Sequence, residues 1–172
     1  MSDPSLSATL EIYNRWRYVV ENALGTEIPD AGTYLYQHTL TDGTGSELAD
    51  RRGLFQRTVA VSANDDIDLA GSLVDIFGNT LTFVKIRKIL IANLSETAGE
   101  KLILDSSVAN SFLSMFNANA TSRHRIDPLG VFLNYSPIDG FAVVATTADI
   151  LRITNGGVGS ITYNLEIIGT TA

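Results

Sequence analysis

Short runs of alternating apolar and polar residues, separated by turn-forming residues, make up most of the chain. In residues 54–62, for example, Val59 and Val61 alternate with Thr58 and Ala60. Alternation with a period of two is typical of a strand that buries one face. Clusters of Gly, Asn, Asp and Ser lie between the runs, as hairpin turns require. We expect strands at residues 33–41, 54–62, 67–69, 81–94, 101–105, 130–135, 141–145, 149–154 and 160–168.

This pattern of about eight or nine short strands predicts an all-β fold, an antiparallel β-sandwich or a barrel. A fold of alternating strands and helices would need helical segments of ten or more residues between the strands, and the pattern offers none. Two shorter stretches are less clear. Leu69, Leu73 and Phe77 have helical spacing and predict a short helix that ends at Gly78. Residues 106–116 fit either a helical stripe or a bent loop.

The apolar phase changes inside the strand expected at 81–94. Val84 and Ile86 share one face, whereas Ile89 and Ile91 share the other. The switch falls at Arg87-Lys88, so either a bulge shifts the phase there or both faces are buried beyond it. Lys85 and Arg87 share one strand face, which we expect either to be solvated or to meet an acidic partner. Solvation is favoured, because strand charges discourage edge-to-edge pairing.

The first 32 residues differ from the rest, and we interpret residues 1–32 as an N-terminal arm and 33–172 as the β-sandwich domain. Leu10, Ile12 and Trp16 suit the alternation of a strand, but Leu6, Leu10 and Tyr13 also suit a helical stripe. Periodicity leaves strand and helix open here.

Composition supports one soluble folded domain. Hydrophobic residues are 45% and charged residues 18% of the 172, which is the opposite of a disordered chain. The absence of cysteine excludes disulfides, a cysteine nucleophile and thiolate metal sites. A net charge of −7 argues against direct nucleic-acid binding. We expect no membrane segment and no signal peptide, hence a protein made in the cytoplasm.

No motif predicts catalysis or a cofactor. The two histidines, His38 and His124, have no carboxylate or serine partner at motif spacing. The acidic stretch 64–68 lacks the glycine and the late glutamate of a calcium loop, so a solvated turn is favoured. The glycine-rich stretch 155–159 precedes an expected strand rather than a helix, which favours a hairpin turn over a phosphate loop. We therefore expect a protein that is not an enzyme and holds no cofactor and no metal.

One cluster has the composition of a binding surface. Arginine and aromatic residues alternate at Tyr13, Arg15, Trp16, Arg17 and Tyr18, and Trp16 is the only tryptophan. These residue types are enriched in interface hot spots. They could also stack on single-stranded nucleic acid, or Trp16 and Tyr18 could simply pack on the body of the domain.

Several segments resemble small structural proteins encoded among the head genes of tailed bacteriophages. The resemblance covers about residues 36–170. It is carried by turn and strand motifs such as YQHTLTDGTG at 36–45, DIDLAGSL at 66–73, FGNTLTFVK at 77–85, IANLSETAG at 91–99 and ADILRITNGG at 148–157. That group includes capsid cement (decoration) proteins, which have a jelly-roll-like sandwich.

The resemblance implies a virion structural protein on the capsid surface. Its partners would be the major capsid protein and other copies of itself, with a homotrimer favoured. An alternative is a carbohydrate- or host-surface-binding module of a phage tail or head fibre, for which Tyr34, Tyr36, Tyr135 and Tyr163 could supply aromatic platforms. A metal-dependent enzyme using His38 or Asp66 is the least favoured hypothesis, because no constellation of catalytic groups supports it.

Overall fold

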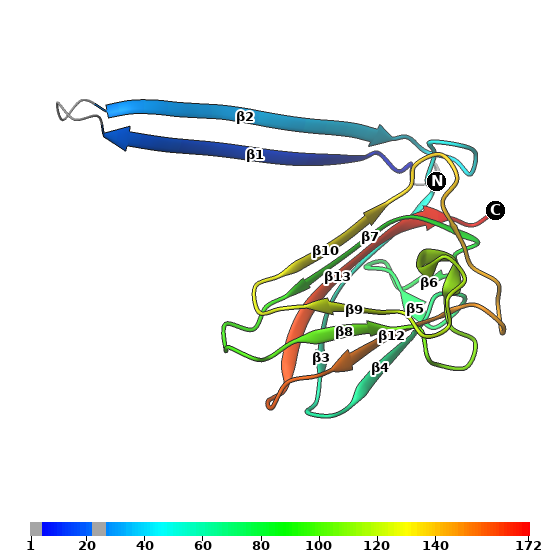
Figure 1. Cartoon of the computed structure of the whole chain (residues 1–172). Coiled ribbons are helices and arrows are strands. Elements are labelled where there is room, and N and C mark those ends of the chain that lie inside the picture. Colours follow the sequence, from blue (N-terminus) through cyan, green and yellow to red (C-terminus); the bar gives the residue numbers. More distant parts are fainter. Residues whose placement is uncertain (1–4, 22–26) are drawn as a thin grey trace.

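The computed structural model describes residues 5–21 and 27–172, and it has two parts: a β-sandwich and a long hairpin that projects from it (Figure 1). The described residues form thirteen strands and one turn of 3-10 helix. The strand pairs between named elements are antiparallel. The expectation of an all-β antiparallel sandwich is therefore confirmed.

The sandwich consists of two sheets. The first sheet has the order β10-β7-β13-β3, and β11 also pairs with β7. Its strands are β3 (Arg51–Val59), β7 (Lys85–Asn93), β10 (Val131–Tyr135), β11 (Phe141–Ala142) and β13 (Ile161–Thr170).

The second sheet has the order β4-β12-β8-β9. Its strands are β4 (Asn64–Asp68), β8 (Leu102–Asp105), β9 (Arg123–Ile126) and β12 (Ile150–Asn155). A small separate hairpin, β5 (Leu73–Val74) with β6 (Thr80–Leu81), lies at one end of the sandwich.

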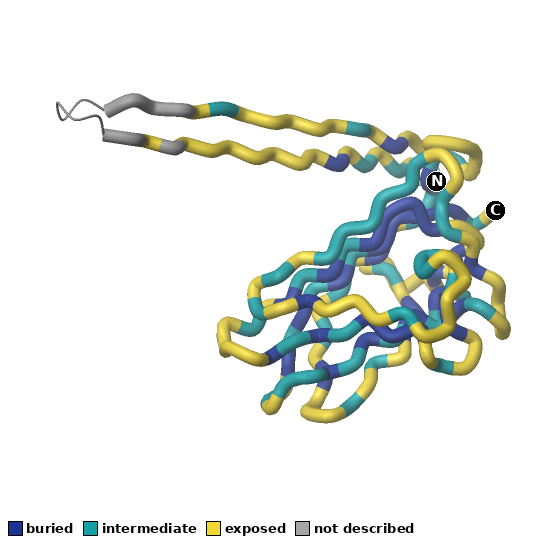
Figure 2. The backbone as a smooth tube through the Cα atoms, in the orientation of Figure 1, coloured by how far each residue is buried: buried dark blue, intermediate teal, exposed yellow. Residues whose placement is uncertain are grey.

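The core lies between the two sheets and follows the alternation of the sequence. Strand β12 alternates regularly between partly exposed and buried residues, and β13 does so along its first half. Leucine and isoleucine side chains fill the interior from both sheets: Ile89, Ile91, Leu165 and Ile167 from the first, and Leu102, Leu104, Leu151 and Ile153 from the second. The buried segments in Figure 2 accordingly lie in the sandwich, and little of the projecting hairpin is buried.

A bulge explains the change of phase in β7. Lys88 pairs with Ile168, but the next pair joins Ile86 to Gly169, so Arg87 is an extra residue on β7. An extra residue shifts the side-chain alternation by one, which brings Ile86 and Ile89 to the same core. Arg87 and Lys88 are both buried in the middle of a sheet. The expectation that Arg87 lies on a solvated face was wrong.

The helix predicted at residues 69–78 does not form, because local hydrogen bonds to aspartate favour turns. Leu69 and Leu73 are buried, whereas Phe77 is exposed, so the three residues share no face. The Asp75 carboxylate accepts hydrogen bonds from the backbone N–H groups of Phe77 and Asn79. Such bonds compete with helical ones. Residues 106–112 form a bent loop, which was one of the two expected alternatives, and only η1 (Leu113–Phe116) is helical.

The arm is a hairpin of two long strands, β1 (Ala8–Glu21) and β2 (Glu27–Leu40). Their register runs from Ala8 opposite Leu40 to Glu21 opposite Glu27. The open choice between strand and helix is thereby resolved as strand. The predicted division at residues 32 and 33 falls inside β2, because this strand pairs with β1 up to Leu40.

Candidate functional site

The hairpin arm is the largest feature outside the sandwich, and its two faces differ. Residues opposite each other in antiparallel strands lie on the same face. One face, here named the aromatic face, holds Leu10, Ile12, Asn14, Trp16, Gly32, Tyr34, Tyr36 and His38. The other, named the mixed face, holds Thr9, Glu11, Tyr13, Arg15, Arg17, Thr33, Leu35, Gln37 and Thr39. Every charged residue among these positions is on the mixed face.

The predicted cluster at residues 13–18 is divided between these two faces. Tyr13, 62% exposed, lies with Arg15 and Arg17 on the mixed face, and Trp16, 43% exposed, lies on the aromatic face. Tyr18 belongs to β1, but its side chain lies outside the described part of the structure. None of these described side chains packs into the sandwich core, and the interface role of the five residues stays a prediction.

Trp16 lies across the hairpin on Gly32. A Cβ atom at Gly32 would come within 2.1 Å of the indole carbon Cζ2, so only glycine leaves room for the ring. An aromatic side chain over a glycine of the neighbouring strand shields otherwise bare backbone. This contact holds the indole against the ribbon and leaves its outer surface exposed.

Cross-strand hydrogen bonds stabilise the mixed face near the sandwich. Thr9 Oγ1 and Thr39 Oγ1 are 2.9 Å apart, and Gln37 Nε2 donates to Glu11 Oε1 at 2.9 Å. Such pairs each contribute on the order of 0.2–1 kcal/mol.

The aromatic face and strand β10 enclose an open groove. Leu10, Ile12, Tyr34 and Tyr36 line it from the arm, and Leu133 and Tyr135 line it from β10, around a volume of about 330 Å³. No lining residue is charged. Three of the four tyrosines considered as aromatic platforms, Tyr34, Tyr36 and Tyr135, thus meet at one site.

A histidine fixes the arm at the mouth of this groove. His38 Nδ1 lies 2.5 Å from the hydroxyl of Tyr135, and Nε2 lies 3.2 Å from Glu47 Oε1. A carboxylate only accepts, so Nε2 carries a proton and, in the neutral ring, Nδ1 accepts from the hydroxyl. Burial raises the pKa of Tyr135 to about 12, with smaller contributions from Tyr36 and Glu47, so the hydroxyl keeps its proton.

Buried Arg87 connects the loops beneath the arm. Its side chain is 1% exposed and donates from Nη2 to the carbonyl of Gly45, from Nη1 to that of Ile138, and from Nε to that of Leu48. Gly45 and Leu48 belong to the loop that follows β2, and Ile138 to the loop after β10. The planar guanidinium suits this arrangement, because its donors point in several fixed directions. Sequence reasoning missed this role, and the signal for it was the phase switch at Arg87-Lys88.

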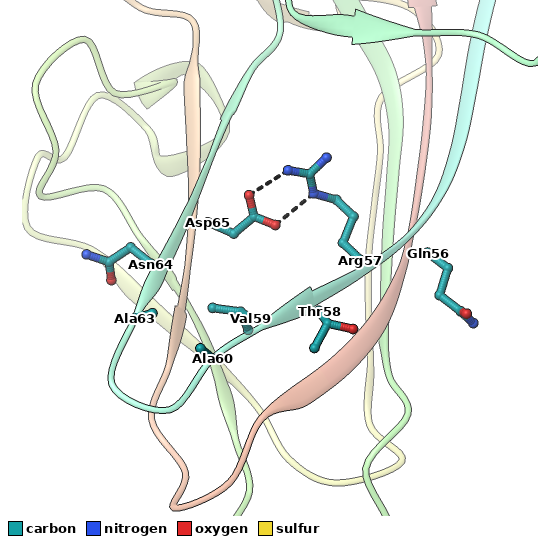
Figure 3. Close-up of a pocket in the computed structure, with 8 residues that line it drawn as sticks. All are labelled: Gln56, Arg57, Thr58, Val59, Ala60, Ala63, Asn64 and Asp65. Carbon is teal, nitrogen blue, oxygen red and sulfur yellow. Dashed lines mark hydrogen bonds and ion pairs between the residues drawn. The ribbon is translucent and has the colours of Figure 1, made fainter.

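A second hollow lies between strands β3 and β4, where the edges of the two sheets meet (Figure 3). Inside it, Arg57 Nε and Nη2 each donate at 2.7 Å to the Asp65 carboxylate, and Tyr163 Oη donates to Asp65 Oδ2 at 2.7 Å. The hydrogen bond to Asp65 raises the pKa of Arg57, and burial raises that of Tyr163. Burial alone would raise the pKa of Asp65, but the bonds from Arg57 and Tyr163 outweigh it and lower that pKa. These polar groups satisfy one another and clamp the two sheets together.

The acidic stretch 64–68 is strand β4 rather than a solvated turn. Asp65 binds Arg57, Asp66 accepts two hydrogen bonds at 2.6 Å from Arg152, and Asp68 accepts from the N–H of Ala70. Within residues 5–21 and 27–172, no group of three or more His, Asp or Glu side chains is placed to hold a metal ion.

The remaining residues considered in the sequence analysis are His124, the glycine-rich stretch 155–159 and Tyr163. His124 lies on β9, and its ring is 4.8 Å from that of Phe132. The glycine-rich stretch is a turn, as expected, but it joins β12 of one sheet to β13 of the other rather than forming a hairpin. Tyr163 is fully buried, so it offers no platform to a ligand. In the described part of the chain, no helix is long and apolar enough to cross a membrane.

Comparison with known protein families finds none whose model matches this chain, and comparison with curated proteins finds no matching relative.

Proposed function

We propose that this chain is a virion structural protein: a capsid cement (decoration) protein that binds the major capsid protein on the outside of a bacteriophage shell. The observation that carries the proposal is the projecting arm. Each of its strands has 14 residues, which at roughly 3.4 Å per residue gives a reach of about 48 Å.

An arm of this kind suits a subunit of an assembly. An isolated two-stranded hairpin is only marginally stable in water, because each strand has one free edge and neither face is covered. Binding to a neighbouring protein removes both costs. The mixed face offers Tyr13, Arg15 and Arg17, residue types that are enriched in interfaces. We therefore assign contact with the shell to the mixed face.

A shell also makes weak contacts effective. Each copy faces many identical sites, so a modest affinity per contact is multiplied by linked binding. The resemblance of residues 36–170 to phage head proteins points the same way, and the sandwich is compatible with the jelly roll of that group. A small oligomer, for which we favour a trimer, would add contacts without any chemistry.

The test is binding of arm variants to capsids that lack the protein. Glu11 and Gln37 are opposite each other, so residues 12–36 can be replaced by a two-residue Asn-Gly turn. The part of the hairpin next to the sandwich, residues 8–11 and 37–40, is then kept. We expect this variant to keep the thermal stability of the sandwich and to lose capsid occupancy.

A matched pair of variants tests the assigned face. Tyr13→Ser with Arg15→Ser alters the mixed face, and Asn14→Ser alters the intervening residue on the aromatic face. The first should reduce occupancy at least about tenfold, as expected for hot-spot residues, and the second should not. Full occupancy by the arm-excised protein would refute the proposed attachment.

The second candidate is a carbohydrate-binding module, which the meeting of Tyr34, Tyr36 and Tyr135 in one groove supports. Aromatic rings in a groove can stack on the apolar face of a sugar. A glycan array distinguishes the two functions: specific binding that is lost in Tyr36→Ala would favour the carbohydrate module over the cement protein.

A further inference from the structure

Strand β1 has a long outer edge that no strand covers in the described part of the chain. Among the described residues, β1 pairs only with β2, in a separate two-stranded sheet. In an antiparallel strand, every second residue directs its N–H and C=O away from the strand that is already paired. Residues 11–17 are exposed, and β10 lies under the aromatic face of the arm rather than beside β1. The outer edge of β1 is therefore a row of backbone donors and acceptors that can pair with another strand.

The outer edge of β2 is a poorer template. Pro29 has no N–H and cannot donate a hydrogen bond to a neighbouring strand. Strand β2 also contains Glu27 and Asp30 but no Lys or Arg, so two β2 edges would repel each other. Strand β1, in contrast, contains two glutamates and two arginines. Two copies of β1 can therefore match opposite charges.

Backbone geometry restricts how two β1 strands can pair antiparallel. Residues with outward-directed backbone groups must meet one another, so the numbers of two opposed residues must add up to an even number. The strands overlap most when this sum is 28 or 30, and in either register all but one residue of each 14-residue strand is paired. A sum of 30 places Arg15 opposite Arg15 of the second copy, and like charges directly opposite each other are destabilising. The register with a sum of 28 avoids this contact.

The register with a sum of 28 also matches opposite charges. It places Glu11 opposite Arg17 of the second copy, and two-fold symmetry repeats this pair. Arginines carry several N–H donors, so Arg17 can bind Glu11 of the second copy in addition to groups of its own arm. Tyr13 lies opposite Arg15, where a guanidinium can stack on the ring. All four residues belong to the mixed face, so the matched pairs lie on one side of the ribbon.

We propose that β1 of one copy pairs with β1 of a second copy, antiparallel and centred on Asn14, so that the two arms form a four-stranded ribbon. On the aromatic face, Ile12 then lies opposite Trp16, which adds an apolar pair to the charged ones. The contact uses the same surface on both partners, so it joins two copies and closes. In a trimer, each arm would therefore pair with an arm of a neighbouring trimer. The mixed faces of the two arms lie side by side and stay available to the shell.

The expected contact is long and narrow. Residues 8–20 span about 44 Å at roughly 3.4 Å per residue, and a ribbon about 10 Å thick would bury on the order of 900 Å² in total. This area exceeds that of most non-specific packing contacts but is smaller than that of a typical stable interface. The paired strands also exchange about 12 backbone hydrogen bonds, as many as a typical interface contains. Association is expected to be weak in dilute solution and stronger where copies are held at neighbouring sites.

The absence of cysteine permits a direct test with an introduced disulfide. Asn14 lies on the two-fold axis, so Asn14→Cys brings two thiols together with Cα atoms about 4.5–5.5 Å apart, a distance that a disulfide spans. Tyr34→Cys is the matched control, because Tyr34 is opposite Asn14 in the hairpin and lies on the same face. In the four-stranded ribbon, the two copies of residue 34 are three strand spacings or about 14 Å apart, which is too far for a disulfide.

Mild oxidation of the free protein at high concentration should therefore give disulfide dimers of Asn14→Cys and few dimers of Tyr34→Cys. Equal yields from the two variants would overturn the proposal, and so would the absence of dimers from both. Dimers that form only when the two variants are mixed would also overturn it, because β1 would then pair with β2 of another copy.

Charge reversal tests the register by sedimentation of the protein without cysteine. Glu11→Arg places like charges opposite each other twice and should weaken dimerisation about tenfold or more. Addition of Arg17→Glu to the same chain restores opposite charges and should restore dimerisation. A double variant that dimerises as weakly as Glu11→Arg alone would contradict the register.

The inference does not depend on the proposed function, because the pairing of arms is measured without capsids. Dimers of the free protein that do not bind capsids would support the paired arms and refute the cement protein. Binding to capsids by a protein whose Asn14→Cys variant forms no dimers would refute the paired arms alone.

Discussion

Replacing Arg87 by methionine tests whether one buried guanidinium stabilises the two loops beneath the arm. In the native protein, Arg87 donates at 2.7 Å to the carbonyls of Gly45 and Ile138 and at 3.3 Å to that of Leu48. Methionine fills similar space but donates no hydrogen bond. The substitution therefore leaves carbonyl groups of two loops without their donors.

The expected loss follows from the two short bonds. A hydrogen bond from a charged donor contributes about 1.5–3 kcal/mol. Gly45 and Ile138 are exposed residues, so water can reach the freed carbonyls. Two such bonds at the lower end of that range give an expected loss of about 3 kcal/mol in the free energy of unfolding. Domains of this size are stable by only about 5–15 kcal/mol, so the variant should be markedly less stable.

Denaturation in urea measures this loss, with Arg125→Met as the matched control. Arg125 is exposed and pairs with exposed Asp127, so its removal should cost less than about 1 kcal/mol. Arg87→Lys should lie between wild type and Arg87→Met, because an ammonium cannot reach three carbonyls in the directions of the guanidinium. If Arg87→Met and Arg125→Met lower the free energy of unfolding by the same amount, Arg87 does not stabilise the loops beneath the arm.

Three further predictions concern other contacts. Gly32→Ala should push the indole of Trp16 off the ribbon and shift its fluorescence to longer wavelength, whereas Gly71→Ala, which meets open space, should not; an unchanged spectrum for Gly32→Ala would contradict the packing. Lys88→Met should lower the free energy of unfolding by about 3 kcal/mol, because Lys88 is buried against Glu166. Arg52→Met removes an exposed partner of the same carboxylate and should cost less than about 1 kcal/mol. A larger loss for Arg52→Met than for Lys88→Met in urea denaturation would be inconsistent with the buried pair. Asp65 and Glu166 both have lowered pKa values, so their stabilising contribution is present above their unfolded pKa values near ~4 and is lost as the pH falls through the folded values. The difference in unfolding free energy between wild type and Asp65→Asn should therefore become smaller as the pH is lowered from 7 to strongly acidic values. A difference that does not change with pH would contradict the stabilising role of the ionised Asp65 carboxylate.

The strands with one regularly buried face were predictable, whereas β9 was missed because only its last residue, Ile126, is buried. In β12, Leu151 and Ile153 are buried and Arg152 is not, which is the pattern a period of two describes. The bulge at Arg87 was detectable as a change of phase, but the destination of its side chain was not. The three carbonyls that receive it lie 39, 42 and 51 residues away along the chain, and local periodicity carries no information about such distances.

The arm was harder to predict for a related reason. A strand of a free hairpin has no buried face, so the alternation of residues 8–21 is weak and a helical stripe fits nearly as well. Its partner strand at 27–40 contains Pro29 and Gly32, which are typical of turns, so a strand was expected only from residue 33. The division of residues 13–18 between two faces followed only when β1 was known to be a strand in register with β2.

The false helix at 69–78 shows the opposite error. Leu69, Leu73 and Phe77 have the right spacing, but the Asp75 side chain supplies the backbone with hydrogen bonds that a turn can use and a helix cannot. An aspartate two residues before Phe77 was a visible signal for this turn. The exposure of Phe77 follows from this turn.

Imaging of capsids at a resolution that separates strands tests the central claim most directly. Difference density between capsids with and without the protein should show the sandwich outside the shell and the hairpin arm lying along the major capsid protein through Tyr13, Arg15 and Arg17. An arm that points away from the shell, or a chain that does not bind capsids at all, would contradict the account.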